Sequence, residues 1–465
     1  MLSSVPPSRS SSLAAQLGRL IGNLRRGKAP TSRTQWALLM CFVVTGLFVL
    51  SSVISALSGT ETKLPTNTHS VAVSTFGAQG HPSKRHKELF RAEPILWPSK
   101  KAQQRQATVF VGIPSFRDSL CFRTVQSLFR KAKHPHRLRV GIYDQVDPHE
   151  GDVPCSHFVD VCNDENEKDR GAECDHIANV VIEEVGSSMA TGVPTARYQM
   201  EKLLDNDSEF FVQVDAHTIF DPEWDTRMIA QWQNTENEFA VLTHYPNVAD
   251  YSDDDYKRAN SLSVLCGAKT KGAMNGFTKW SGQVWNKRTL KSPKDVPILM
   301  PFWGGGLSFS KAHRVRNVPY DPRLLFVFDA DELTLSARLF TTGYDCYAPT
   351  ENLVYHYYAS AVKRPHVWDE GWDIKSKTNK KSAERVHALF GMPVDSMKHP
   401  DTSEVAVGEL YGLGQARTLQ DFWQFARMDI TKNPPETTDF CADMAANPLK
   451  LAPYQRDPAE VNHIY

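Results

Sequence analysis

The feature that most constrains this chain is a strand, a helix and a second strand that follow one another closely between residues 108 and 146. Thr108–Ile113 is an apolar run of β-forming residues that ends in a Pro-containing turn. Residues 118–132 place their apolar side chains at helical spacing, and the segment RLRVGIYDQV that begins at 137 predicts a second strand ending at Asp144. A βαβ unit of this kind implies a parallel sheet with helices on its faces. The sequence therefore predicts an α/β fold with a mostly parallel central sheet.

Further elements continue this pattern along the chain. Strands are predicted at 175–185, 210–214 and 241–246, and helices at 194–207 and from about 331 to 342. The glycine-rich segment at 302–310 predicts tight turns. Residues 250–295 are charged and rich in turn-forming residues, and their pattern gives no assignment.

The end of the strand at 210–214 carries a candidate cation site. Parallel sheets bind ligands beyond the carboxyl ends of their strands, and Asp215 and His217 directly follow this one. Side chains at i and i+2 of an extended segment project to the same side, so both can reach one point. A carboxylate oxygen and an imidazole nitrogen suit a borderline divalent cation such as Mn²⁺. The alternative is that Asp215 caps the following turn and His217 lies on the surface.

The N-terminal part of the chain has a composition of its own. Residues 1–35 carry basic but no acidic side chains, and Trp36–Leu57 contains no charged residue. A helix of about 20 residues crosses a bilayer, and the positive-inside rule keeps the basic flank in the cytosol. We therefore expect a transmembrane signal anchor at 36–57 in a single-pass type II membrane protein, followed by a flexible stem at 58–105. A cleaved signal peptide or an organelle-import sequence is the alternative.

Charge and cysteine content narrow the class of protein further. Lys plus Arg and Asp plus Glu number 53 each, so no global field draws the chain to nucleic acid, and we expect no nucleic-acid partner. Seven cysteines follow the predicted membrane span, and in a lumenal domain they allow up to three disulfides with one thiol left over. Cys155, Cys162 and Cys174 lack the paired C-x₂-C of a zinc site, which favours a disulfide-stapled loop.

An ordered set of motifs resembles one enzyme family from about Thr108 to Tyr358. The motifs are VFVGIPSFRD (109–118), VGIYDQ (140–145), TGVPTARY (191–198), FFVQVDAHTIFDPEWD (210–225), WGGGLSFSKA (303–312), VPYDPRL (318–324), DADELTLSARLFTTGYDCYAP (329–349) and VYHYY (354–358). They resemble the polypeptide α-N-acetylglucosaminyltransferases of the GT-A fold, which modify hydroxyproline or threonine and are related to the mucin-type GalNAc-transferases. YGLGQARTLQDF (411–422) is similar to the end of that family.

The resemblance implies a role for each matching position. Asp215, His217 and His356 match a metal site in which Mn²⁺, with Mg²⁺ as the alternative, holds the diphosphate of a UDP-sugar donor. The implied donor-binding residues are Arg117, Asp118, Asp144, Arg197, Gly305 and Gly306. The implied catalytic residues are Asp331 and Glu332, together with Asp215.

The residue types alone leave simpler interpretations open at several of these positions. Arg117 and Asp118 are compatible with an ion pair at a helix start, and His356 with a packed strand histidine. The glycines at 304–306 suit a tight turn at positive φ, or else a close approach of the backbone to a sugar. Asp329 suits the N-cap of the following helix, whose dipole favours acids in its first turn.

The segment DADE at 329–332 departs from the family pattern. The family usually has Gly followed by two acids, whereas this chain has Ala330 before Asp331 and Glu332. An added methyl group restricts the backbone, which puts the identity of the donor sugar in question more than catalysis itself.

The resemblance implies a Golgi enzyme with a lumenal GT-A domain at 106–360 and a C-terminal extension at 361–465 on or near the acceptor side. It implies transfer of GlcNAc from UDP-GlcNAc to a Ser, Thr or hydroxyproline hydroxyl of a polypeptide acceptor, with retention. In this sequence no pair of carboxylates stands out as a covalent nucleophile with its partner, as in retaining glycosidases. The alternatives are UDP-galactose or UDP-GalNAc as donor, a non-catalytic sugar-binding homologue, or a metal-dependent hydrolase, which the lack of a two-metal cluster disfavours.

Overall fold

The structure is a computed structural model. It describes residues 107–429 apart from 165–167, 169, 250–260, 270–278, 287–295, 359–363, 370 and 392–400, together with 436–437, 441 and 444. The predicted cytosolic tail, signal anchor and stem lie outside the described residues. Within the part of the chain that is described, no helix has the length and apolar character needed to cross a membrane.

The predicted βαβ unit is confirmed. β1 (Val109–Phe116) leads through α5 (Cys121–Lys131) to β2 (Leu138–Val146), and the two strands pair in parallel with Val111 opposite Val140. β4 (Phe210–Val214) pairs in parallel with the other edge of β1. Three carboxyl ends therefore meet at one rim of the sheet, which the sequence predicted as the ligand rim.

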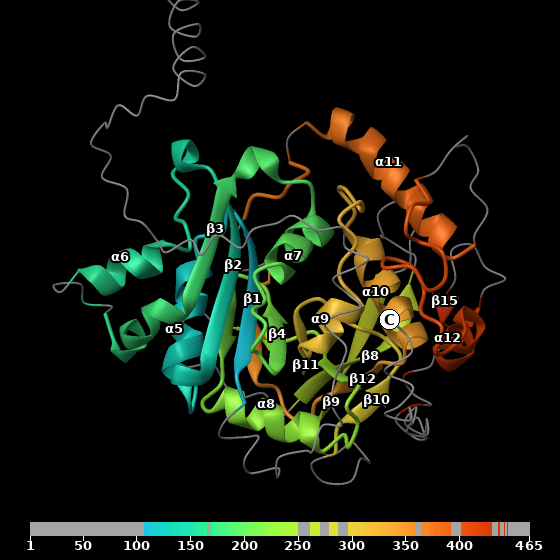
Figure 1. The fold of residues 1–465 in the computed structure, drawn as a ribbon, viewed down its shortest axis with the longest axis horizontal. Helices are drawn as coiled ribbons and strands as arrows, with labels where there is room; N and C mark the ends of the chain where they lie inside the picture. Colours follow the sequence, from blue (N-terminus) through green and yellow to red (C-terminus); the bar gives the residue numbers. More distant parts are fainter. Residues whose placement is uncertain are drawn as a thin grey trace, which may run out of the picture. The chain divides into compact units, whose positions relative to one another are not determined.

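Eight strands make up the central sheet, in the order β10-β12-β6-β11-β4-β1-β2-β3 (Figure 1). The strands not yet placed are β3 (Val180–Gly186), β6 (Ala240–Thr243), β10 (Ile298–Met300), β11 (Leu307–Lys311) and β12 (Asp345–Ala348). β11 runs antiparallel between β4 and β6, and β10 runs antiparallel beside β12. The sheet is thus mixed but mostly parallel, as predicted.

Helices cover both faces of this sheet because its strands alternate their apolar side chains. Val111 of β1 and Val212 of β4 share an apolar cluster with residues of α5 and of α8 (Trp224–Gln233). The alternate residues Phe110 and Phe211 stack on each other at 5.9 Å between ring centroids. They share a second cluster with residues of α7 (Val193–Glu201) and α9 (His313–Asn317). Burial on both faces is typical of strands in a parallel sheet.

A long buried helix, α10 (Asp329–Thr342), packs with the C-terminal helices in one apolar cluster. It confirms the predicted helix at about 331–342 and ends at Gly343, whose φ of +99° suits a glycine C-cap. Its core cluster includes residues of α11 (Trp372–Leu389) and α12 (Leu419–Phe425). Helices α11 and α12 therefore share one hydrophobic core with α10.

A small second sheet determines where His356 lies. It has the order β5-β13-β7, formed by β5 (Thr218–Phe220), β13 (Val354–His356) and β7 (Asn247–Val248). β13 runs antiparallel to β5 and places His356 opposite Thr218. Because β5 begins directly after His217, this pairing brings His356 next to the end of β4 across a long stretch of sequence.

The predicted disulfides are present. They join Cys121 to Cys155, Cys162 to Cys174 and Cys266 to Cys441, and the buried Cys346 is a free thiol. Cys155, Cys162 and Cys174 are therefore all in disulfides. This confirms the prediction of a disulfide-stapled loop instead of a zinc site.

The remaining elements lie in loops and at edges. The short helices are η1 (Pro135–Arg137), η2 (Pro148–Glu150), α6 (His157–Asn163), η3 (Ala172–Asn179) and η4 (Ser187–Met189). The remaining strands are β8 (Ser261–Lys269), β9 (Lys279–Asn286), β14 (Met428–Asp429) and β15 (Glu436–Thr437). β8 and β9 form a hairpin within the range that the sequence left unassigned.

Three predicted elements are shorter than expected. The strand predicted at 241–246 ends at Thr243. The strand predicted at 175–185 begins only at Val180, because η3 occupies the residues after the disulfide-bonded Cys174. The helix predicted at 194–207 ends at Glu201, and the side chain of Asp205 then accepts hydrogen bonds from the backbone N–H groups of Asp207 and Ser208 in a turn.

Candidate active site

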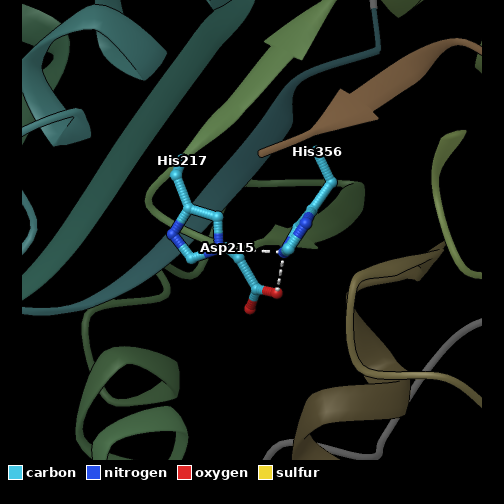
Figure 2. Close-up of side chains that lie close together, drawn as sticks. All are labelled: Asp215, His217 and His356. Atoms are coloured by element: carbon cyan, nitrogen blue, oxygen red, sulfur yellow. Dashed lines mark hydrogen bonds and ion pairs between the residues drawn. The ribbon is translucent and has the colours of Figure 1, made fainter. Parts of the chain in front are cut away.

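Asp215, His217 and His356 converge beyond the end of β4 (Figure 2). Each offers one ligand atom, and the three atoms lie within 4.8 Å of one another. His356 Nε2 lies 3.0 Å from Asp215 Oδ2 and 2.9 Å from His217 Nε2. The predicted site residues are thus together, and the set of two imidazoles and one carboxylate fits a divalent transition metal such as Mn²⁺.

The surroundings of these ligands favour a cation over a capped turn. The turn after Asp215 is closed by the Thr218 hydroxyl, which donates to the backbone carbonyl of Asp215, while the Asp215 carboxylate faces His356. His356 is buried, and its Nδ1 has no hydrogen-bond partner among the described residues. The Asp215 side chain therefore faces His356 and does not cap the turn.

The charges at this point suit metal ligation. Burial raises the pKa of Asp215, but the hydrogen bond from His356 and the nearby charge of Arg197 outweigh that effect and hold the pKa well below its usual range. Burial lowers the pKa of His356 below its ordinary value, although the hydrogen bond to Asp215 opposes this. An ionised carboxylate and a neutral imidazole are the protonation states that bind metal.

Asp118 lies against the metal-site histidine. Its Oδ2 is 2.6 Å from His217 Nδ1, and its Oδ1 accepts the backbone N–H of Leu120 at 3.0 Å. Arg364 Nε lies 3.7 Å from the same Oδ2. Burial raises the pKa of Asp118, but the hydrogen bond from His217 and the adjacent positive charge lower it overall. Asp118, which the resemblance placed near the donor, therefore contacts a candidate metal ligand.

Arg117 points to a different partner from its neighbour. It adopts a left-handed backbone conformation with φ of +49°, and its Nε donates to Asp152 Oδ2 at 2.8 Å. The alternative of an Arg117–Asp118 ion pair is therefore not what forms. Asp144, at the end of β2, is buried and accepts the backbone N–H of Cys155 at 2.7 Å. Burial raises the pKa of Asp144 to about 6.

Arg197 connects the candidate metal ligand Asp215 to the start of α10. Its Nη1 forms an ion pair with Asp331, and its Nη2 lies 3.5 Å from Asp215 Oδ1. Nη2 also donates to the carbonyl oxygen of Gly305 at 3.4 Å. Its Cζ lies 5.8 Å from the ring centroids of Trp303 and of Tyr320, within cation–π range. One buried guanidinium thus holds residues from three distant segments.

Glu332 is held by two donors at the same end of α10. Its Oε1 accepts the backbone N–H of Gly305 at 2.8 Å, and its Oε2 accepts the hydroxyl of Tyr245. Burial raises the pKa of Glu332 to about 7. The N-cap position of α10 is Phe328, so Asp329 is the first helical residue and not the N-cap, and the side chain of Ala330 is fully buried.

Close approach explains the glycine run. None of Gly304, Gly305 and Gly306 is among the glycines with positive φ, so a left-handed turn does not require them. A Cβ at Gly305 would lie 2.4 Å from Arg197 Nη2, and one at Gly304 2.7 Å from Leu265 Cδ1. A Cβ at Gly306 would lie 2.9 Å from the Pro246 ring, so all three glycines admit neighbouring side chains.

Sequence reasoning missed several residues of this site. Tyr245 lies just beyond β6, so the strand-end rule would have found it if it had been applied there. Arg364 belongs to the predicted C-terminal extension, and no local signal in the sequence marks its contact with Asp118. Trp303 and Tyr320 pack against Arg197 through contacts that no spacing in the sequence reveals.

The chain matches one family of known proteins over most of its length. The sequence model of the family described as glycosyltransferase (GlcNAc) matches residues 108–432, which is more than half of the chain. A search of curated proteins found no match.

Three solved structures are among those similar to the chain. GalNAc-T7 with UDP, GalNAc and Mn²⁺ is 16% identical with a TM-score of 0.39; the match covers 61% of this chain and 48% of that one, so the chain spans about half its length. S. aureus TarS with UDP-GlcNAc is 10% identical with a TM-score of 0.34, and the match covers 62% of this chain and 68% of that one. The mannosyltransferase PcManGT from Pyrobaculum calidifontis, with GDP-Man and Mn²⁺, is 12% identical with a TM-score of 0.32, and the match covers 68% and 72%.

The extent of the family match agrees with the ordered motifs read from the sequence, and it continues through the described C-terminal residues that share the core of α10. This chain belongs to the GlcNAc glycosyltransferase family.

Proposed function

We propose that this chain is a metal-dependent, retaining GT-A transferase that moves GlcNAc from UDP-GlcNAc to a Ser, Thr or hydroxyproline hydroxyl of a polypeptide. The observation that carries the proposal is the convergence of Asp215, His217 and His356 beside Arg197, in a chain of the GlcNAc glycosyltransferase family. A bound Mn²⁺, or Mg²⁺, would neutralise charge on the departing diphosphate.

The residues around the cation site have separate tasks in this proposal. Asp215, His217 and His356 hold the cation, and Arg197 fixes the second oxygen of Asp215. The ion pair of Arg197 with Asp331 fixes the first turn of α10 against the metal ligands. This arrangement supplies a preorganised positive region where negative charge develops on the donor.

Retention without a covalent intermediate is supported by the state of the two α10 carboxylates. Asp331 is paired with Arg197, and Glu332 accepts hydrogen bonds from Gly305 and Tyr245. Carboxylates bound in this way suit the positioning of a sugar better than nucleophilic attack. We propose that the leaving phosphate accepts the proton of the acceptor hydroxyl, with the protein supplying orientation.

A Golgi location with a lumenal catalytic domain is part of the proposal. Its supports are the uncharged run at Trp36–Leu57 with a basic flank before it, and the three disulfides of the folded domain. Disulfides persist in oxidising compartments such as the secretory pathway.

The donor and the acceptor can be tested separately. Purified protein is incubated with UDP-GlcNAc, UDP-GalNAc and UDP-galactose, each with Mn²⁺ or with a chelator, and release of UDP is measured for wild type and for Asp215→Ala. We expect metal-dependent release that is fastest with UDP-GlcNAc and lost in the variant. Faster UDP release from another donor would show that this donor, and not UDP-GlcNAc, is the substrate. UDP binding without any turnover would indicate a non-catalytic homologue. Mass spectrometry of a peptide library after reaction would identify the acceptor.

A further inference from the structure

The tautomer of His217 decides whether it can bind a cation. The ring faces His356 with Nε2 and Asp118 with Nδ1. A neutral imidazole offers its lone pair at one nitrogen only, so ligation through Nε2 requires the proton on Nδ1.

Asp118 imposes that tautomer because its carboxylate can only accept hydrogen bonds. Oδ1 accepts the backbone N–H of Leu120 at 3.0 Å, and Oδ2 lies 2.6 Å from His217 Nδ1. An ionised carboxylate only accepts hydrogen bonds, so Nδ1 must donate. Asp118 is 4% exposed, which leaves it little access to water as a substitute partner.

His356 has no comparable support. Its Nδ1 is buried, and it has no hydrogen-bond partner among the described residues. The fixed imidazole of the site is therefore His217.

We propose that Asp118 is a positioning residue of the metal site: it holds His217 with Nε2 free for the cation and acts through that ring, without contacting the cation. The proposal rests on the proposed function, because it assumes that Asp215, His217 and His356 bind a cation. Carboxylates that accept the second N–H of a metal-binding histidine orient the ring and raise its basicity.

The competing explanation is that Asp118 only forms a turn by accepting the N–H of Leu120. Asn at this position separates the two explanations. If its amide oxygen keeps the bond to Leu120, its NH₂ group faces Nδ1 and forces the proton to Nε2, which blocks ligation. If the amide oxygen turns to His217, the NH₂ group meets the N–H of Leu120, donor against donor.

Asp321 provides a matched control. It is 5% exposed, its Oδ1 accepts a backbone N–H two residues later, from Arg323 at 3.0 Å, and its Oδ2 accepts one side-chain N–H, from Arg385 at 2.7 Å. Its partners include none of the candidate metal ligands. Asp321→Asn therefore repeats the loss of a buried carboxylate in a turn without touching the site.

The test is a Mn²⁺ titration of the metal-free full chain, followed by electron paramagnetic resonance, for wild type, Asp118→Asn and Asp321→Asn. Thermal unfolding in chelator accompanies it. We expect Asp118→Asn to weaken Mn²⁺ binding by about 10–100-fold, and Asp321→Asn to bind within about threefold of wild type, at comparable thermal stability. Wild-type affinity in Asp118→Asn would overturn the proposal while leaving the proposed function intact. Failure of wild type to bind Mn²⁺ would overturn both.

A second measurement does not depend on any variant. Long-range ¹H–¹⁵N spectra of metal-free wild type labelled at histidine report the tautomer of His217, with assignment from His217→Gln. We expect the proton on Nδ1. A proton on Nε2 alone would overturn the proposal even if Asp118→Asn failed to fold.

Discussion

Arg197 Nη2 lies 3.5 Å from Asp215 Oδ1, so a buried guanidinium stands directly beside a candidate metal ligand. The same side chain forms an ion pair with Asp331 at the start of α10. The metal ligands and the first turn of α10 are thus linked by one residue of α7. A change at Arg197 should therefore affect cation binding and donor binding together.

Substitution of Arg197 by Lys tests this link. Lys keeps the charge but loses the planar fork that reaches Asp331, Asp215 and the Gly305 carbonyl together. We expect a loss of up to about 3 kcal/mol in the free energy of unfolding and a fall in Mn²⁺-dependent UDP affinity, measured by calorimetry.

Arg314 is the matched control for that experiment. It is fully buried and forms an ion pair with Glu201 of the same helix α7. Arg314→Lys should lower stability without changing UDP affinity. Equal losses of UDP affinity in both variants would show that Arg197 acts only through general stability.

Gly305→Ala should displace Arg197 through a direct clash. The added Cβ would lie 2.4 Å from Nη2, and the guanidinium cannot move without losing its ion pair with Asp331. We expect a destabilisation of about 1–3 kcal/mol, and a fall in kcat/KM for donor turnover of about 100-fold. Gly186→Ala is the control, since its nearest neighbour would be Ser188 Oγ at 3.6 Å, an ordinary contact. An active Gly305→Ala enzyme would argue against a fixed Arg197.

Asp144 should make stability depend on pH. Burial raises its pKa from 3.8 to about 6, so the folded protein binds more protons than the unfolded chain between pH 4 and 6. Stability contributed by this group is therefore lost as pH rises through that window, by about 3 kcal/mol in total. Relative to wild type, Asp144→Asn should gain that much between pH 4 and 6 and no more above it, as measured by denaturant unfolding. A difference that does not vary with pH would contradict the raised pKa.

The disulfide between Cys266 and Cys441 should contribute the most to stability. It closes a sequence separation of 175 residues, compared with 12 for Cys162–Cys174. Loop-closure entropy gives about 5 kcal/mol for the longer loop and about 3 kcal/mol for the shorter. Replacing both cysteines of each pair by Ser and measuring the free energy of unfolding would compare them. A larger loss from the short loop would show that chain entropy is not the main contribution.

Local patterns in the sequence predicted individual strands and helices and the residues that follow directly at their ends. The strand at Phe210–Val214 and the placement of Asp215 and His217 at its rim follow from apolar runs and from strand periodicity. The position of His356 came from family resemblance, because its approach depends on the pairing of β13 with β5. No periodicity in a single sequence specifies that pairing.

The contacts that the sequence did not predict are long-range and polar. Asp118 and His217 are 99 residues apart, and Arg197 and Asp331 are 134 residues apart. The antiparallel insertion of β11 between β4 and β6 was likewise not predicted. It places Gly305 beside Arg197, so glycines read as a turn instead make room for a side chain.

The proposed cation site is tested most directly by UDP release from UDP-GlcNAc by wild type and by His356→Ala, in chelator and after addition of Mn²⁺. We expect turnover by wild type to stop in chelator and to recover when Mn²⁺ is added. In Mn²⁺, His356→Ala should be slower by about 100- to 1,000-fold, because a Lewis acid lowers the barrier by several kcal/mol. Turnover that persists undiminished in chelator, or in His356→Ala, would contradict a cation site formed by Asp215, His217 and His356.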